Sequence, residues 1–409
     1  MLKRIGLPMN LTAAEQMLLK ALRAALRGES VEEEHSAGDW EALMALSAAH
    51  KVLPLVGEAV YACPSAREVW SRYKARSIAQ VTAQTVKSCQ FMALYDRMRQ
   101  EGLHPLVVKG IVCRALYPRG DHRISGDEDL FVPDGEFSAC CEALRRSGLV
   151  PTGDEEGFEV GWRREGSPLY IELHRRLFAP DAGAYGELER FFDASRRVSY
   201  PVEGGSVDSL TPHDHMLYLL LHAYKHFIHS GFGIRQVCDI GLWAKAYGAG
   251  IDWERLYEQC GKAHALTFSA AVFQIARRYL GVELALPRRW EAISTDCEPM
   301  LRDLLGAGIY GSAQRSRLHS ATVTLGAVES QRKAGRGGML GSLFPSRRSM
   351  EGKYPVLKKH PWLLPGAWCL RLVRYGAGTL TAGKENSAAE ALRIARERTE
   401  LLRFYDIIE

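Results

Sequence analysis

Hydrophobic residues in the first hundred positions recur every three or four residues, the spacing that places them on one face of a helix. This pattern predicts helices over residues 11–26, 39–49 and 66–101. Thr12, at the start of the first segment, and Ser65, just before the third, are of the residue type that caps a helix N-terminus. The N-terminal part of the chain is therefore expected to be helical.

The pattern changes at Gly102, where short β-branched and alternating runs replace the helical spacing. LHPLVVKG predicts a strand that ends in a turn, IVCRALYP a short helix, and DEDLFV a half-buried strand. A further helix is predicted near residues 134–147, and the turn EGSP separates two strands at 158–163 and 169–174. These elements indicate a small α/β core.

Helical spacing returns after Thr211, which together with Pro212 has the residue order of a helix start. The predicted helices cover residues 213–227, 234–247, 253–264, 267–279 and 388–404. The expected fold class is therefore α+β, with a small mixed β-sheet core flanked by all-α regions. Its expected parts are an N-terminal helical region (1–101), the α/β core (102–200), a helical bundle (201–330), and a basic linker with a C-terminal helical region (331–409).

The composition is that of a folded protein, because 46% of the 409 residues are hydrophobic and 25% are charged. No apolar run approaches the ~18 residues needed to span a bilayer. The early Lys-Arg pair is not followed by the apolar stretch of a secretory signal, and the nine cysteines include no C-x-x-C pair. We expect a cytoplasmic protein.

Positive charge is concentrated in residues 331–375, which contain ten Lys or Arg and one acid, although the whole chain carries only +5. Trp362 and Trp368 are interleaved with these cations, so weak contact with an anionic surface is one interpretation. A solvated basic surface over a buried aromatic anchor is preferred, because four prolines prevent one long amphipathic helix. No nucleic-acid reading motif accompanies the segment, so sequence-specific nucleic-acid binding is not expected.

Asp127 and Asp129 are the first candidates for chemistry. In a strand they are two positions apart, so both carboxylates project from one face, where they can share divalent cations, while Glu128 points away. Oxygen ligands of this kind suit Mg²⁺ or Mn²⁺, and Glu172 in YIELH is a third acid on a strand that can lie beside the first. The alternative is that the two aspartates are solvated and that Glu172 pairs with an arginine such as Arg175.

Lys109 and Gly110 stand where the first strand of the core meets the following helix. Free backbone N–H groups at such a point, together with the lysine charge, make a cradle for phosphate. Acids that hold metal and amides that hold phosphate are the components of phosphoryl or nucleotidyl transfer.

Several segments together resemble a known family. The order K-G, a helix ending in Y-P, and then R-x-x-G-D-x-D-L resembles the nucleotidyltransferase-like family of the DNA polymerase β superfamily. IELHRRLF resembles the family's third-carboxylate strand, TPHDHMLYLLLHAYKH its helix with two histidines, and IRQVCDIGLW the helix that follows. The resemblance implies a nucleotidyltransferase core in which Asp127 and Asp129 bind two metal ions, with Glu172 as third ligand or base.

One departure from the superfamily concerns the phosphate turn, where Gly-Ser is usual and this chain has Lys109-Gly110-Ile111. No hydroxyl follows the glycine, so Lys109 is the candidate that replaces it at the triphosphate. Arg123 is a further candidate for phosphate contact. Its alternative role is a surface ion pair with a nearby acid such as Asp121.

Two pairs with a spacing of four residues lie in the predicted bundle. His222 and His226 have a spacing that can bind zinc, but no third ligand is indicated, so packing or phosphate contact is preferred. Arg235 and Asp239 suggest an ion pair within one helix, or residues that line the substrate side of the cleft. All four are retained as candidate substrate-binding residues.

The leading hypothesis is a Mg²⁺-dependent or Mn²⁺-dependent enzyme that moves a nucleotidyl group from an NTP, with ATP expected, to a hydroxyl or phosphate acceptor. The acceptor is a small molecule, peptide or protein that the sequence does not identify. Phosphoryl transfer on the same scaffold is the first alternative, and a non-catalytic nucleotide-binding or scaffold protein is the second.

Overall fold

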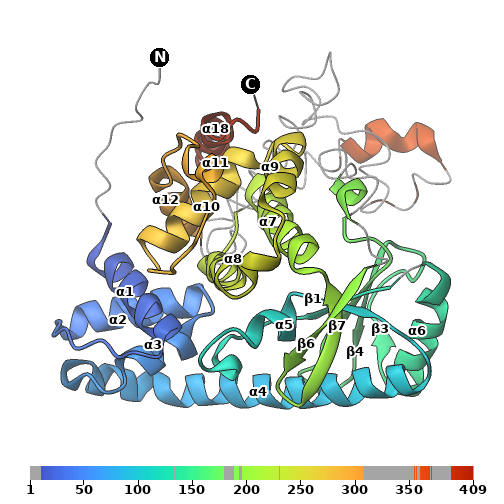
Figure 1. The fold of residues 1–409 in the computed structure, drawn as a ribbon, viewed down its shortest axis with the longest axis horizontal. Helices are drawn as coiled ribbons and strands as arrows, with labels where there is room; N and C mark the ends of the chain where they lie inside the picture. Colours follow the sequence, from blue (N-terminus) through green and yellow to red (C-terminus); the bar gives the residue numbers. More distant parts are fainter. Residues whose placement is uncertain are drawn as a thin grey trace.

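A computed structural model of the chain combines one mixed β-sheet and one hairpin with surrounding helices, which confirms the predicted α+β class (Figure 1). The structure describes residues 11–132, 134–178, 188–192, 196–229, 231–307, 354, 356, 360–368, 370 and 388–408.

The central sheet has five strands: β1 (Leu106–Val108), β2 (Glu128–Phe131), β3 (Val150–Pro151), β4 (Glu159–Arg163) and β5 (Tyr170–His174). Their order in the sheet is β1-β2-β5-β4-β3. The pair β2 and β5 is parallel and all other pairs are antiparallel. The strands predicted around the acidic residues therefore lie in one sheet, as expected.

A second, two-stranded sheet is formed by β6 (Arg197–Val202) and β7 (Gly205–Leu210). The sequence analysis did not predict this hairpin, which continues past residue 200, where the core was expected to end. Its turn uses Gly204 and Gly205, both with positive φ. In Figure 1 the hairpin lies beside β1, so it extends the strand-rich part of the molecule.

The N-terminal region contains α1 (Ala13–Arg27), α2 (Ala37–Ala49), α3 (Leu53–Val60) and α4 (Arg67–Gln100). Thr12 caps α1 through a reciprocal hydrogen-bond pair with Glu15, as predicted. Ser65 does not cap α4; its hydroxyl instead accepts a hydrogen bond from the Trp40 indole. The long α4 runs beneath both the N-terminal helices and the sheet, and therefore connects these two parts (Figure 1).

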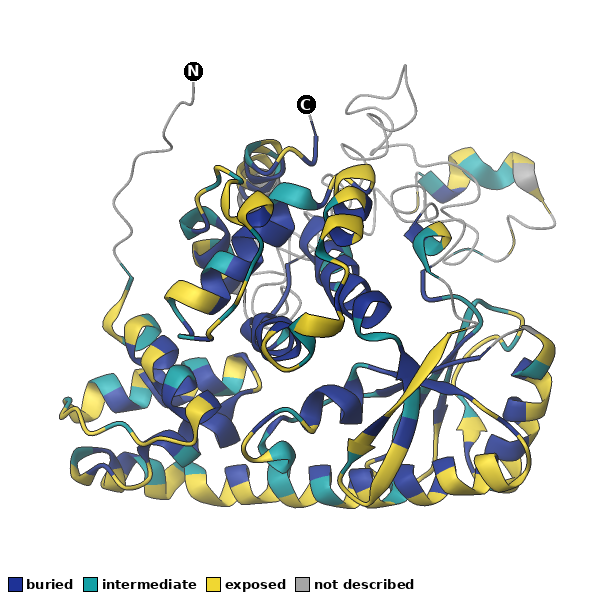
Figure 2. Ribbon diagram, in the orientation of Figure 1, coloured by how far each residue is buried: buried dark blue, intermediate teal, exposed yellow. Residues whose placement is uncertain are grey.

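Two helices belong to the core itself. The short α5 (Gly110–Arg114) directly follows β1, and α6 (Asp134–Arg146) follows β2. Figure 2 shows the buried residues concentrated where the sheet meets its helices and where the upper helices meet one another. The core strands and helices share one continuous hydrophobic cluster with the N-terminal and C-terminal helices.

The helices that follow the core are α7 (Pro212–His229), α8 (Ile234–Tyr247), α9 (Trp253–Lys262), α10 (Leu266–Arg278), α11 (Arg288–Glu291), α12 (Glu298–Ala307) and α18 (Ala388–Phe404). Thr211 caps α7, because its hydroxyl oxygen accepts from the Asp214 N–H at 3.1 Å. The described 3₁₀ turns are η1 (Pro64–Ala66), η2 (Gly120–His122), η3 (Leu188–Phe191), η4 (Gly248–Gly250) and η6 (Pro361–Leu363).

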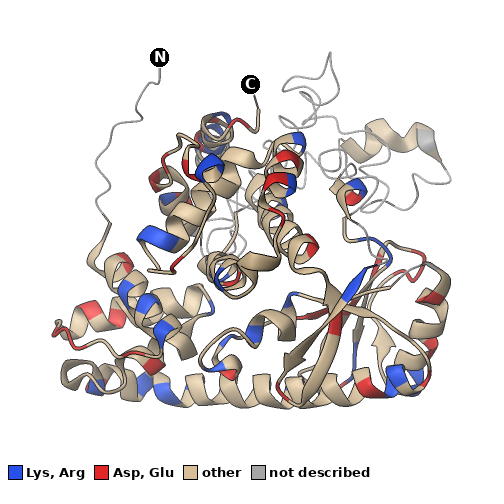
Figure 3. Cartoon of the chain, in the orientation of Figure 1, with Lys and Arg blue, Asp and Glu red and all other residues tan. Residues whose placement is uncertain are grey.

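Most of the basic segment 331–375, including the expected linker at 332–341, lies outside the described residues. Within its described part, Trp362 is 74% exposed at η6, whereas Ala367 is buried against Leu363, Leu364 and Trp368. Figure 3 shows basic and acidic positions intermingled along the described helices. In the part of the chain that the structure covers, no helix is long and apolar enough to cross a membrane.

Candidate active site

Two of the three predicted acids come together at the junction of β2 and β5, and the third, Asp127, lines the same pocket as Asp129. The parallel register places Asp129 directly opposite Glu172, and Asp127 lies one residue before β2. Asp129 is only 1% exposed, so it is not a solvated strand residue. Arg175, the alternative partner of Glu172, instead places its guanidinium over the Phe137 ring at 3.8 Å.

Glu128, between the two aspartates, points to the other face of β2, as the strand alternation predicts. It is completely buried. Its carboxylate accepts hydrogen bonds from Arg114 Nη2 at 2.6 Å, from the Ile111 N–H at 2.9 Å and from Ser125 Oγ at 3.0 Å. Glu128 therefore ties the start of α5 to β2.

The Lys109-Gly110 turn has a constrained backbone. Lys109 has φ 57°, a region that side-chain-bearing residues rarely adopt, and its N–H donates to His215 Nε2 at 3.2 Å. A Cβ on Gly110 would lie 2.1 Å from Glu128 Oε2. Only glycine fits there, and the turn directs Lys109 Nζ to within 2.9 Å of Asp129 Oδ1.

The phosphate cradle expected at this turn is partly occupied by the protein itself. The N–H of Ile111, at the N-terminal end of α5, already donates to Glu128. This contact explains how the turn is stable without the usual Gly-Ser hydroxyl. It leaves the Lys109 ammonium as the positive group of the turn that lines the adjoining pocket.

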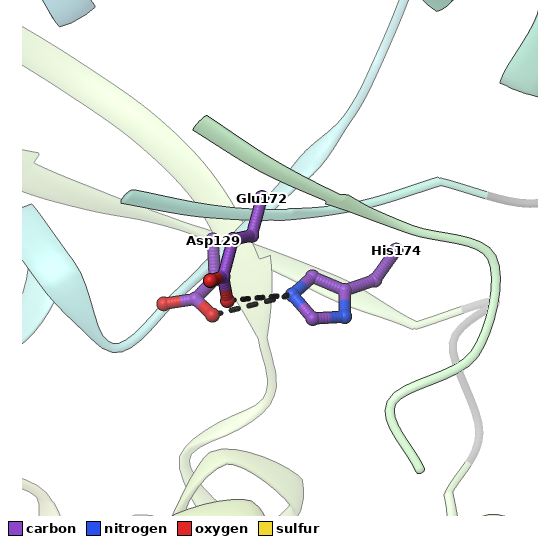
Figure 4. A group of neighbouring side chains, drawn as sticks. All are labelled: Asp129, Glu172 and His174. Carbon is purple, nitrogen blue, oxygen red and sulfur yellow. Dashed lines mark hydrogen bonds and ion pairs between the residues drawn. The ribbon is translucent and has the colours of Figure 1, made fainter. Parts of the chain in front are cut away.

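His174 joins the acids, although the sequence analysis did not select it. Its Nε2 lies 3.3 Å from Asp129 Oδ1 and 3.7 Å from Glu172 Oε2 (Figure 4). Glu172 and His174 are two positions apart on β5, so they share one face by the same rule that was applied to Asp127 and Asp129. The signal was therefore present in YIELH.

The charges of the site affect its carboxyl groups in opposite ways. Burial, followed by repulsion from Asp129 and Asp127, raises the pKa of Glu172 to about 7. Burial also acts to raise the pKa of Asp127, but the positive charges of Lys109 and Arg235 outweigh it, so this pKa lies below its ordinary value. The site thus holds more negative charge than its neighbouring cations fully neutralise.

Arg123 and Asp239 form a buried ion pair with each other. Arg123 donates to Asp239 from Nε at 3.0 Å and from Nη2 at 2.5 Å, and the Tyr117 hydroxyl donates to the same carboxylate at 2.7 Å. The predicted alternatives, a surface pair of Arg123 with Asp121 and a helix pair of Asp239 with Arg235, were therefore wrong about the partner. These interactions fasten the loop before β2 to α8.

Arg235 and the two histidines lie around the same pocket. Arg235 donates through Nη1 to the Ile124 carbonyl and is buried. His222 Nε2 lies 3.1 Å from Lys109 Nζ and 3.3 Å from His226 Nε2. Burial, followed by the Lys109 charge, holds the pKa of His222 well below its usual value, and burial lowers the pKa of His226 to about 3. Both imidazoles are therefore neutral at pH 7.

One pocket unites most of the predicted residues. Eight of the ten line it, namely Lys109, Gly110, Arg123, Asp127, Asp129, His222, Arg235 and Asp239. The other two lie next to lining residues: Glu172 is the strand partner of Asp129, and His226 contacts His222. Within the described ranges, the one group of at least three side chains with converging metal-ligand atoms is Asp129, Glu172 and His174.

A pocket with paired strand acids beside a lysine-glycine turn is the arrangement expected of a nucleotidyltransferase core. The chain belongs to the uncharacterised nucleotidyltransferase family, whose model matches residues 36–281, more than half of its length. The matched region extends from the start of α2 through α10 and includes every residue of the pocket. No curated protein and no solved structure matches the chain.

Proposed function

We propose that this protein transfers a nucleotidyl group from an NTP, with ATP as the expected donor, to a hydroxyl or phosphate acceptor. The observation that carries the proposal is the β2–β5 register, which pairs Asp129 with Glu172 in the pocket beside Lys109. Membership of a nucleotidyltransferase family supports the reaction class. The acceptor remains a small molecule, peptide or protein.

The acidic side chains fit a divalent cation, Mg²⁺ or Mn²⁺. Oδ2 of Asp129 is buried and has no hydrogen-bond partner among the described residues, which is unusual for a carboxylate oxygen and would be relieved by a bound cation. Asp127, Asp129 and Glu172 are the proposed ligands. The chemistry that such cations supply is neutralisation of the charge on the phosphate oxygens and activation of the acceptor hydroxyl.

The remaining pocket residues are proposed to bind and orient the nucleotide. Lys109 Nζ lies at the phosphate turn and can contact the triphosphate by a charge-assisted hydrogen bond. Arg235 also lines the pocket, and its Nε has no hydrogen-bond partner in the described ranges of the chain. Arg123 positions the loop before Asp127 through its pair with Asp239, while still lining the pocket.

A second candidate function, nucleotide binding without transfer, is favoured by one specific contact. Glu128 accepts the Ile111 N–H, so this amide does not donate to a phosphate in the present conformation. A site that held the triphosphate weakly or in a different position would bind nucleotide and turn it over poorly.

Radiolabelled ATP distinguishes these functions. The full-length protein is incubated with Mg²⁺ or Mn²⁺, extract from the source cells, and ATP labelled either at the α-phosphate or at the γ-phosphate. Nucleotidyl transfer moves the α-label onto an acceptor and releases pyrophosphate. The Asp129→Asn variant should lose this labelling, whereas Glu165→Gln, an exposed acid in the turn between β4 and β5, should retain it.

The outcomes separate the candidates. Labelling from the γ-phosphate with release of ADP would identify a phosphotransferase instead. Saturable ATP binding without labelled product, in extract that contains the acceptor, would support the binding protein. Labelling that persists in Asp129→Asn would contradict the assignment of this pocket.

A further inference from the structure

The histidine beside the acidic pair has no assigned role in the function proposed above. Nε2 of His174 lies 3.3 Å from Asp129 Oδ1 and 3.7 Å from Glu172 Oε2, and Figure 4 shows the ring edge directed at both carboxylates. One ligand atom from each of the three residues lies within 4.8 Å of the others. His174 is buried, so this arrangement is part of the packed sheet and not a surface cluster.

Strand geometry fixes both sides of the imidazole. His174 lies two residues beyond Glu172 on β5, and Glu159 is its cross-strand partner on β4. Nδ1 faces the Glu159 carboxylate at 3.6 Å. A histidine that binds a metal through one ring nitrogen commonly directs the other toward a carboxylate, which orients the ring and increases its basicity.

A second observation points to a cation at this position. Asp129 is 1% exposed and lines the pocket, and within the part of the chain that the structure describes its Oδ2 has no hydrogen-bond partner. Its Oδ1 already contacts Lys109 Nζ and His174 Nε2. A buried carboxylate oxygen without a partner is costly, and a cation shared with the neighbouring ligand atoms would remove that cost.

We propose that His174 Nε2 is a metal ligand together with Asp129 and Glu172, so that this site prefers a first-row transition ion such as Mn²⁺ to Mg²⁺. The inference rests on the metal site of the proposed function and specifies its ligands. Mg²⁺ takes oxygen ligands almost exclusively, whereas the first-row divalent ions, of which Mn²⁺ has the lowest affinity, also accept imidazole nitrogen. An imidazole added to the carboxylate ligands therefore discriminates between the two ions.

The test is electron paramagnetic resonance of Mn²⁺ added to the full-length, chelator-treated protein. The loss of the free Mn²⁺ signal gives the affinity, and competition with Mg²⁺ gives the preference. Electron spin-echo modulation then detects any nitrogen bound to the ion. We expect Mn²⁺ to bind at least ~10-fold more tightly than Mg²⁺ and to show nitrogen modulation.

Variants identify the nitrogen. His174→Gln should abolish the modulation and weaken Mn²⁺ binding by ~10-fold or more, with a much smaller effect on Mg²⁺. His222→Gln, which changes an imidazole that lines the pocket away from the two acids, should preserve the modulation. If His174→Gln does not fold, the unmodified protein is prepared with ¹⁵N-labelled histidine. The modulation of bound Mn²⁺ must then change from the pattern of ¹⁴N to that of ¹⁵N.

Two results would overturn the inference: bound Mn²⁺ without nitrogen modulation, or equal affinity for Mn²⁺ and Mg²⁺. Either result, accompanied by α-label transfer in Mg²⁺, would leave the proposed function standing. Conversely, nitrogen-coupled Mn²⁺ without any transfer would support the ligand set and count against the function. Failure of both ions to bind would contradict the metal site altogether.

Discussion

The two faces of β2 carry acids whose negative charges are neutralised to different degrees by neighbouring basic side chains. On one face Glu128 is completely buried but is matched by Arg114, with Lys87 Nζ also within 3.8 Å. On the other face Asp129 lies opposite Glu172, and among the described residues Lys109 and His174 are its basic ion-pair partners. Adjacent residues of one strand thus serve different purposes: the acid with a matched counter-charge organises the fold, and the acids on the other face are the proposed cation ligands.

Removing the charge of Glu128, the acid matched by Arg114, should produce the largest change, and that change is in stability. Glu128→Gln leaves the buried Arg114 without its counter-charge, so we expect the free energy of unfolding to fall by about 3–5 kcal/mol. Chemical denaturation monitored by circular dichroism measures this change. Glu142→Gln, which removes an exposed partner of Arg145, is the control and should cost no more than about 0.5 kcal/mol. Equal effects of the two substitutions would contradict the structural role of Glu128.

Asp129→Asn is the corresponding change on the unbalanced side and should affect activity instead of stability. The substitution preserves the shape of the side chain but removes the charge of a proposed metal ligand, so transfer of the α-label should fall at least ~100-fold, which is about 2.7 kcal/mol of barrier. Unfolding under the same conditions should change little. A variant that loses its fold together with its activity would show that Asp129 also has a structural role.

The face of the strand on which each of these residues lies could be predicted from the local sequence pattern. Strand alternation places Asp127 and Asp129 on one side and Glu128 on the other, and the same period-two rule applies to Glu172 and His174. The long helices follow from their hydrophobic spacing, because a repeat over many residues leaves little ambiguity. These features need no knowledge of distant parts of the chain.

Other features depend on residues that are far apart in sequence. The pair of Arg123 with Asp239 joins positions separated by 116 residues, and no local pattern indicates which acid an arginine will meet. Similarly, the contact of Glu128 with the Ile111 N–H emerges only when β1 and β2 pair. The β6–β7 hairpin was missed because Pro201 weakens the strand pattern, although its Gly-Gly turn is visible.

The excess negative charge should also be measurable as a pH effect on stability. The pKa of Glu172 is raised from 4.5 to about 7, so the folded, metal-free protein binds this proton more tightly than the unfolded chain. The resulting stabilisation is complete below about pH 4.5 and is lost as the pH rises through about 7. Relative to the unmodified protein, Glu172→Gln should therefore gain about 1–3 kcal/mol between about pH 5 and about pH 8.

The free energies of unfolding of the variant and of the unmodified protein are measured with chelator at several pH values. Their difference isolates Glu172, because groups that titrate in both proteins contribute equally to each. Glu165→Gln provides the control, because this exposed acid should give the same difference at every pH. A Glu172→Gln difference that does not vary with pH would contradict the unbalanced charge.

The smallest expected effect concerns the cation that partly balances the acids. Lys109→Ala removes the ammonium 2.9 Å from Asp129 Oδ1, and with it the proposed contact to the triphosphate. We expect ATP affinity, measured by calorimetry, to fall ~10-fold, about 1.4 kcal/mol. Binding of Mn²⁺ alone should be retained or strengthened, because the variant removes a positive charge that competes for the same carboxylate. Lys245→Ala, at the exposed end of α8, should change neither quantity. Weaker Mn²⁺ binding in Lys109→Ala would instead indicate that the lysine organises the acids, and the two faces of β2 would then differ less than their charges indicate.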